Sequence, residues 1–458
     1  MRRFQSLYSV VLLALLSSLT LVGCRDALYD RSFPDCTEQQ EAEVTPGTLE
    51  DGVTMTLAYE SHALKTPGTL RAALSVEQES DLKLATTRVL IFNSNGEYQY
   101  DAPLTKITPD PSDHQKGTLT VQIKPGQGLG IVVLANLSKD DKVRKLSGTK
   151  ADILKSFAYS VAQDTDFSSV GIPMFGEVTQ VEVKTDTQPV PTLGDTIPLL
   201  RAVARVDVGL QMSAVGTTGK DADFDETASD LISTIVEPAD GSSKKVKWTL
   251  LETKFYNAAS EGLVVPAEAN YKLDGSKLKA TAPTLPQTPG KQTLTYEVTG
   301  NLLKRNIYVP EVDNPEPEVT QNGNETDPTK DTYYSNRPYL ILKLQYEEVD
   351  DANKVKTGVT PGTTYFRVDF LKREGKEATA KYTYLPLLRN HRYKVDIRNI
   401  GGLGFDSEDD AKKGPSANIM YNVLVWDESE MSDVMYDGQY MLGVSKNVVE
   451  TYKSGGSM

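Results

Sequence analysis

The sequence predicts a mainly β protein built from antiparallel β-sandwiches. Many short segments alternate apolar and polar residues, turn signals such as 94–96 and 240–241 separate them, and one segment alone has convincing helical spacing. Alternation with a period of two is typical of a strand with one buried face. Frequent turns favour hairpins over the helical crossovers of a parallel sheet.

The first predicted strand covers residues 53–59, in which the larger apolar residues alternate. Further strands are predicted at 87–93, 118–123, 129–136, 178–184, 202–212, 248–256, 339–346, 365–370, 393–400 and 419–426. The longest alternation places Ala202, Ala204, Val206, Val208, Leu210 and Met212 on one face, and Arg205, Asp207 and Gln211 on the other. Trp248 and Trp426 both fall within strands, so we expect them in cores.

The helical segment covers about residues 150–159. Ile153, Leu154 and Phe157 recur there at the spacing of one helix face. We expect this short helix to lie over an edge or end of a sheet.

The N-terminus carries an export signal. Arg2 and Arg3 precede an apolar run over 7–22, and the run ends in Leu21-Val22-Gly23-Cys24. Small residues before a cysteine resemble the bacterial lipobox, in which the thiol of the new N-terminal cysteine is acylated. No later stretch approaches the roughly 18 apolar residues that cross a bilayer. The sequence therefore predicts a signal peptide over 1–23, a lipid on Cys24, and a body outside the membrane.

Composition limits the classes of partner. The net charge of -14 over 458 residues argues against nucleic acid, whose phosphates require basic patches. Only two cysteines occur, Cys24 and Cys36, and acylation of Cys24 leaves Cys36 without an intramolecular disulfide partner. Stability must therefore come from packing.

Two boundaries are visible. Residues 24–52 are acidic and rich in turn formers, as expected of a tether between lipid and fold. The Pro- and Thr-rich stretch 188–196 precedes the long strand near Arg201, so we place a domain boundary there. The acidic stretch 310–331 is predicted to be a surface loop, with a third small domain as the alternative.

No catalytic, metal or cofactor site is visible in the sequence. His62, His114 and His391 are far apart, and His391 is expected to be structural or on the surface. Asp221, Asp223 and Asp225 have the spacing of a calcium loop, but Glu226 and Ile232 replace its glycine and bidentate glutamate. Gly126, Gly128 and Gly130 precede a strand instead of following one, which predicts a turn and not a phosphate-binding loop. We therefore expect a non-enzymatic protein without a cofactor.

A strand, an exposed loop and an arginine follow one another near the mature N-terminus. The strand is 53–59, the loop is 65–69, and Leu70-Arg71-Ala72-Ala73 places a basic residue among small ones. Exposed loops are preferred sites of proteolysis. A cut between Arg71 and Ala72 would release lipid, tether and strand together, and a strand from a neighbouring molecule could then take the vacant place. The alternative is that Arg71 is an ordinary loop arginine.

Several motifs together resemble the Bacteroidetes fimbrillin superfamily, the FimA and Mfa-type fimbrial proteins. They are the lipobox at Cys24, Thr69-Leu70-Arg71-Ala72, Arg88-Val89-Leu90-Ile91-Phe92-Asn93, Ile172-Pro173-Met174-Phe175-Gly176, Leu200-Arg201-Ala202-Val203-Ala204-Arg205-Val206, Arg389-Asn390-His391-Arg392-Tyr393 and Val423-Leu424-Val425-Trp426. They occur in the family's order along the whole chain.

The resemblance implies two transthyretin-like antiparallel β-sandwich domains, over 72–198 and 199–458, after a propeptide over 24–71. It implies export as a lipoprotein to the outer membrane, cleavage after Arg71 by an arginine-specific protease of the gingipain type, and assembly into a cell-surface fimbrium by donor-strand exchange. The partners implied are shaft and accessory fimbrillins, with a host or matrix ligand as a further candidate.

The chain resembles an accessory or tip subunit of the FimC type in its size, in the 310–331 insertion and in its continuation beyond Trp426. Arg71 argues against the anchor subunit. Residues 431–449 are a candidate inter-subunit strand, and an ordinary C-terminal edge strand is an equal alternative. A lipid-anchored glycan- or protein-binding module that does not polymerise is the alternative function.

Overall fold

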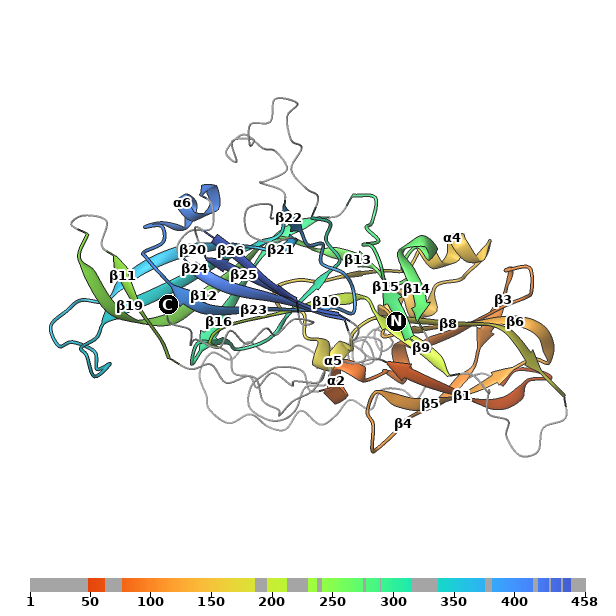
Figure 1. Ribbon diagram of the computed structural model, residues 1–458. Coiled ribbons are helices and arrows are strands. Elements are labelled where there is room, and N and C mark those ends of the chain that lie inside the picture. Colours follow the sequence, from red (N-terminus) through yellow and green to blue (C-terminus); the bar gives the residue numbers. More distant parts are fainter. Residues whose placement is uncertain are drawn as a thin grey trace, which may run out of the picture. The chain divides into compact units, whose positions relative to one another are not determined.

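The computed structural model describes residues 48–61, 76–185, 196–211, 230–236, 241–274, 277–288, 290–314, 337–374, 381–414, 419–427, 430–437 and 440–445. Within these ranges, no helix combines the length and the apolar character that crossing a bilayer requires. The described chain is mainly β, as the sequence predicts (Figure 1).

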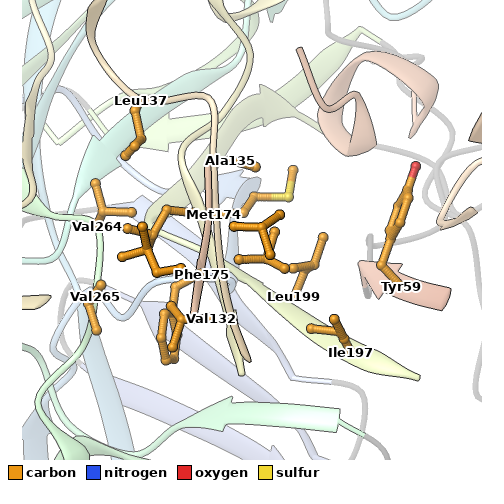
Figure 2. Packing of buried hydrophobic residues seen from close by; sticks show 14 of the residues in the cluster. Tyr59, Val132, Ala135, Leu137, Met174, Phe175, Ile197, Leu199, Val264 and Val265 are labelled. Carbon is orange, nitrogen blue, oxygen red and sulfur yellow. The ribbon is translucent and has the colours of Figure 1, made fainter. Parts of the chain in front are cut away.

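The first sheet has the strand order β3-β2-β6-β8-β9-β1-β5-β4. Its strands are β1 (Val53–Ser61), β2 (Arg88–Phe92), β3 (Tyr98–Ala102), β4 (Leu104–Pro109), β5 (Lys116–Ile123), β6 (Gly126–Ala135), β8 (Met174–Val183) and β9 (Ile197–Arg201). Side chains from this sheet, together with residues of other segments such as Val264 and Val265, form the first hydrophobic core, part of which is seen in Figure 2.

The second sheet follows the order β20-β19-β12-β16-β17-β10-β23-β24-β25-β26, with β11 beside β12 and β18 beside β10. Its strands are β10 (Val203–Leu210), β11 (Leu231–Val236), β12 (Ser243–Ala259), β16 (Lys291–Thr299), β17 (Leu302–Leu303), β18 (Ile307–Pro310), β19 (Tyr339–Glu348), β20 (Gly362–Asp369), β23 (Arg392–Ile400), β24 (Ile419–Asp427), β25 (Glu430–Asp437) and β26 (Tyr440–Ser445). A second core lies against it and contains Trp248, as expected; the side chain of Trp426 lies outside the description.

Three strand pairs and several short helices complete the described elements. The pairs are β7 (Ala158–Ser160) with β13 (Glu261–Leu263), β14 (Tyr271–Asp274) with β15 (Lys277–Ala280), and β21 (Leu371–Glu374) with β22 (Lys381–Tyr384). The helices are α2 (Val76–Ser80), α3 (Lys139–Val143), α4 (Lys150–Lys155), α5 (Phe167–Val170) and α6 (Glu408–Lys413), with 3-10 turns η1 (Leu84–Thr86) and η2 (Glu268–Asn270).

Every predicted strand segment lies in or overlaps an observed strand. Most neighbouring strands in these sheets are antiparallel, as predicted, with two exceptions: β1 runs parallel to β9, and β10 runs parallel to β23. Turn signals report only local hairpins, whereas these parallel neighbours come from segments far apart in the chain. Sequence patterns therefore could not reveal the two parallel contacts.

The predicted helix over 150–159 is shorter than expected. It begins after Thr149, whose hydroxyl accepts a hydrogen bond from the Asp152 amide at 3.3 Å, and it ends at Lys155. Tyr159 instead pairs with Gly262 in the two-stranded pair β7–β13. The last turn of the predicted helix is therefore not helical, because its residues pair with the distant strand β13 instead. The other helices have six residues or fewer, which is too short for a helical period to show.

The alternating glycines lie within β6 and do not form the predicted turn. The pairing of β6 with β8 shifts register between Gly126 and Leu129, and Gly128 has φ of +65°. This is a β-bulge, in which a glycine adopts a conformation that other residues disfavour. The glycines thus bend a strand.

The start of the predicted acidic surface loop is buried. Glu311 accepts hydrogen bonds from Arg389 Nη2 at 2.7 Å and from the Thr284 amide at 2.9 Å. Val312 forms an isolated bridge with Leu387. Residues 310–314 are therefore part of the fold, because a distant arginine compensates the carboxylate; the remainder of the stretch, 315–331, lies outside the described residues.

The sheets change between β9 and β10, at Ala202. The domain boundary predicted between residues 198 and 199 falls inside β9, which belongs to the first sheet. The described pairing therefore assigns 199–201 to the first sheet, while the division into the two named domains stays a prediction.

Helix α6 is fixed to the second sheet by a cluster around Glu408. Lys254 Nζ donates to Glu408 Oε2 at 2.6 Å, Lys412 Nζ lies 3.2 Å from Oε1, and the Tyr256 hydroxyl also donates. Burial alone would raise the pKa of Glu408, but these three donors lower it to about 2. The ionised carboxylate therefore stabilises the folded state.

We expect Glu408→Gln to lower the free energy of unfolding by about 1 kcal/mol at neutral pH, since partly exposed pairs are screened by solvent. The folded pKa is below the ordinary value of 4.5, so this stability is fully present above pH 4.5 and is lost as the pH falls towards 2. Urea unfolding of both proteins between pH 2 and 7 measures the difference. Asp409→Asn, at a carboxylate that is 80% exposed, is the matched control; a constant difference at all pH values would contradict the assignment.

Candidate functional site

The first strand, β1, is an interior strand of its sheet. It pairs antiparallel with β5, from Val53 opposite Ile123 to Glu60 opposite Lys116, and parallel with β9 from Tyr59 to Ser61. Strand β1 therefore satisfies backbone groups of two neighbours. If it left the sheet, β5 and β9 would each acquire an unpaired edge.

Alternate side chains of β1 point into the first core. Met55, Leu57 and Tyr59 are 3%, 0% and 2% exposed. Figure 2 shows Tyr59 with Ile197 and Leu199 of β9 in the same cluster. Burying a side chain of this size stabilises a fold by about 1.5–3 kcal/mol. We refer to the space that β1 occupies between β5 and β9 as the β1 groove.

Tyr59 occupies the end of the β1 groove. Its ring lies over Gly117 of β5, where an added Cβ would be 2.5 Å from the tyrosine hydroxyl oxygen. Burial raises the pKa of Tyr59 to about 12, and the negative charge of Asp81 adds to this rise. A cavity of about 450 Å³ adjoins the ring and is also lined by Thr108 and Lys116. This end of the groove is thus shaped for an uncharged aromatic side chain.

The segment before β1 and the last residue of β1 are both hydrogen-bonded to β5 or to the residue that precedes it. The Leu49 amide donates to Gln122 Oε1 at 2.9 Å, and the Ser61 amide donates to the Gln115 carbonyl at 2.7 Å. The Ser61 hydroxyl donates to the same carbonyl at 3.2 Å. Strand β1 therefore ends at Ser61 as an anchored element.

The described chain resumes at α2, which is held by different contacts. Arg201 Nε donates to the Glu79 carbonyl at 2.9 Å, and Arg201 Nη2 donates to Ser80 Oγ at 3.0 Å. Arg205 Nη1 donates to the Glu79 carboxylate at 2.8 Å, and the Tyr308 hydroxyl also donates to it. A break in the chain between Ser61 and Val76 would therefore leave α2 attached to β9 and β10.

Glu79 belongs to a buried ionic network. Arg205 Nε donates to Asp207 Oδ1 at 2.9 Å, and Arg392 Nε donates to Asp207 Oδ2. Burial would raise the pKa of Asp207, but Arg205 and Arg392 hold it below its usual range. Sequence alternation correctly separates Arg205 and Asp207 from the apolar face. Glu79, the partner of Arg205, was not predicted, because no pattern near residue 79 in the sequence indicates a contact with a residue 126 positions away.

Most of the other residues singled out in the sequence lie outside the described part of the chain. Cys24, Arg71, Ala72, His62, Asp221, Asp223 and Asp225 lie outside the described residues. His391 is buried, with Nδ1 2.8 Å from the Arg389 carbonyl oxygen, in agreement with a structural histidine. In the described ranges, no three His, Cys, Asp or Glu side chains are grouped as a metal site would require.

Comparisons with known proteins find one matching family model and several similar solved structures. A family model described as major fimbrial subunit protein (FimA) matches residues 54–222, less than half of the chain. The match begins within β1 and includes most of the first sheet and β10. No curated protein sequence matches significantly.

Solved structures with low sequence identity also match. A Parabacteroides distasonis protein described as a candidate for cell adhesion is 16% identical, with a TM-score of 0.46 over 82% of this chain and 99% of that one. The tip fimbrial protein Mfa3 of Porphyromonas gingivalis, truncated at its C-terminus, is 15% identical, with a TM-score of 0.42 over 82% and 100%. A fimbrilin (FimA) of Porphyromonas gingivalis is 14% identical, with a TM-score of 0.40 over 81% and 96%. By sequence, the segment 54–222, which holds the β1 groove, is similar to the FimA major fimbrial subunit family.

Proposed function

We propose that this protein is a subunit of cell-surface fimbriae, exported as a lipoprotein precursor on Cys24 and released by cleavage after Arg71. A strand from a neighbouring subunit then takes the place of β1. The match of residues 54–222 to the FimA family supports the fimbrial role. The observation that carries the mechanism is that β1, an interior strand, immediately precedes the segment that contains Arg71.

Filling the β1 groove with another strand is energetically more favourable than leaving it empty. Loss of β1 would uncover three apolar core positions and the backbone groups of β5 and β9. Unsatisfied buried backbone groups cost about 1–3 kcal/mol each. An extended segment that supplies main-chain hydrogen bonds and alternate apolar side chains recovers these contacts. Repeated from subunit to subunit, the same step builds a fibre.

The end of the chain offers a candidate donor. The candidate inter-subunit segment 431–449 contains β26 and all of β25 except its first residue. These two strands extend the second sheet beyond β24 (Figure 1). In the described part of the chain, β26 pairs only with β25, so one of its sides is an edge. An edge strand is the element that can pair with another subunit.

Within the fibre we assign this chain to the accessory or tip class. The size of the chain, the 310–331 insertion and the strands beyond Trp426 support this class over a minimal shaft subunit. The presence of Arg71 supports it over a permanently lipid-bound anchor. Partners are then other fimbrial subunits, an arginine-specific protease, the outer-membrane lipid of the precursor, and a host or matrix ligand.

The first test is the N-terminal sequence of the protein recovered from sheared surface fibres. We expect a start at Ala72, because cleavage after Arg71 removes lipid, tether and β1 together. The membrane fraction of the same cells provides the control, since the precursor there should be blocked at an acylated Cys24. Fibres that contain only the blocked form would overturn the proposed processing.

A further inference from the structure

Three antiparallel strand pairs in the described part of the chain place a tyrosine directly opposite a glycine. The pairs are Tyr59 with Gly117 (β1 and β5), Tyr159 with Gly262 (β7 and β13), and Tyr346 with Gly362 (β19 and β20). In each pair the ring occupies the space where a side chain on the glycine would begin. An added Cβ would lie 2.6 Å from the ring of Tyr159, and equally tight contacts occur in the other two pairs.

These glycines are needed for space and not for backbone freedom. Gly117, Gly262 and Gly362 are absent from the glycines with positive φ. A ring laid across a glycine on the neighbouring strand covers exposed backbone and fixes the register of the pair. A register slip of one residue would turn the ring to the other face of the sheet. The tyrosine–glycine pair therefore fixes the alignment of neighbouring strands at three places in the described chain.

The pair at Gly117 differs from the other two in two respects. Tyr59 belongs to β1, the strand that leaves in the proposed function, whereas Tyr159 and Tyr346 lie outside the segment removed by the cut. A Cβ on Gly117 would also lie 2.7 Å from the Thr108 carbonyl oxygen, so the strand on the other side of β5 closes this space too. Departure of β1 would leave a notch at Gly117, lined by Thr108 and open to the adjoining cavity.

We infer that the Gly117 notch determines which strand the β1 groove accepts, by selecting an aromatic residue at the position of Tyr59. The inference rests on the proposed function, because it concerns the strand that replaces β1. The occupant is an extended segment of another subunit whose inward positions read apolar, apolar, aromatic, as Met55, Leu57 and Tyr59 do. A flat ring covers the glycine and Thr108, whereas a small side chain leaves both uncovered.

The test uses the full chain with a site for a sequence-specific protease inserted between residues 61 and 76. After cutting, the nicked protein is incubated with an excess of a fluorescent peptide of residues 53–61, and uptake is followed by anisotropy. We expect the parent peptide and its Tyr59→Phe variant to bind about equally. The Tyr59→Ala peptide should bind about a hundredfold more weakly, because it loses a buried aromatic side chain.

The chain itself supplies matched variants. In nicked Gly117→Ala protein the parent peptide should bind worse, and its preference over the Tyr59→Ala peptide should fall below about tenfold. Gly362→Ala disturbs the same kind of pair between two retained strands, so it should leave the hundredfold preference unchanged.

The outcomes separate the two ideas. Uptake of the Tyr59→Ala peptide as tight as that of the parent would overturn the notch and leave strand exchange standing. Failure of every peptide to enter would overturn strand exchange and this inference with it. The peptide series on the parent protein decides the question even where Gly117→Ala fails to fold.

Discussion

Arg71→Ala is expected to give a lipid-bearing precursor that folds, stays on the cell surface and contributes nothing to fibres. In the uncut chain β1 is an intramolecular occupant of its groove. A short tether gives an effective concentration in the millimolar range, so a donor strand present at micromolar concentration is disfavoured about a thousandfold. The measurement is the quantity of fibres on cells that carry the variant, with the N-terminus of any fibre protein.

Lys65→Ala is the control for this experiment, because it removes a second basic residue from the same segment and leaves Arg71 in place. It should assemble like the parent. Equal thermal unfolding of the Arg71→Ala precursor and the uncut parent would show that folding is intact. Fibres of normal length that contain the uncut variant would refute processing as the trigger of assembly.

Arg205→Ala is expected to have the largest effect on stability. The substitution leaves Glu79 and Asp207 buried with fewer compensating charges, since both accept hydrogen bonds from Arg205. Removal of one partner from a buried ionic group costs about 3–5 kcal/mol. Urea unfolding of parent and variant at neutral pH measures the loss. The variant should also release α2 from β10, which proteolysis of the folded protein would detect.

A double-mutant cycle locates the cause. In the Arg205→Ala background, Glu79→Gln removes an uncompensated charge and should restore part of the lost stability. Lys304→Ala breaks the exposed pair with Glu297 and serves as the control with no measurable effect. If Arg205→Ala proved as mild as this control, the buried network would not be a major source of stability.

The features that depend on local sequence patterns, namely strand positions and buried strand faces, were predicted correctly. The period of two located β1, β5, β12, β19 and β23, because alternation records which face of a strand meets a core. The place of Trp248 in a core follows from the same pattern. The pattern also predicted which face of β10 is apolar. The other face of β10 is also buried and carries the ion pair of Arg205 and Asp207. Alternation indicates which way a side chain points, but not whether it is exposed to solvent.

The errors have a common cause. Helix α4 ends early because Tyr159 meets Gly262, and 310–314 is buried because Glu311 meets Arg389. The glycines of β6 form a bulge against β8. In each case a partner far away in the sequence overrides a local preference. Such pairing depends on the free energy of long-range contacts, which no local window of sequence contains.

The sequence by itself determined the mainly β class, the strand positions, and the order of the lipobox-like motif at Cys24, the first strand and Arg71, from which a processing site is predicted. Only the tertiary structure decided that β1 is an interior strand between β5 and β9, that Gly117 lies under Tyr59, and that Arg205 holds Glu79. Alternation specifies which side of a strand is buried, but not which strand lies beside it. The choice of neighbour is made by packing and hydrogen bonding between segments distant in the chain, and that choice creates the β1 groove.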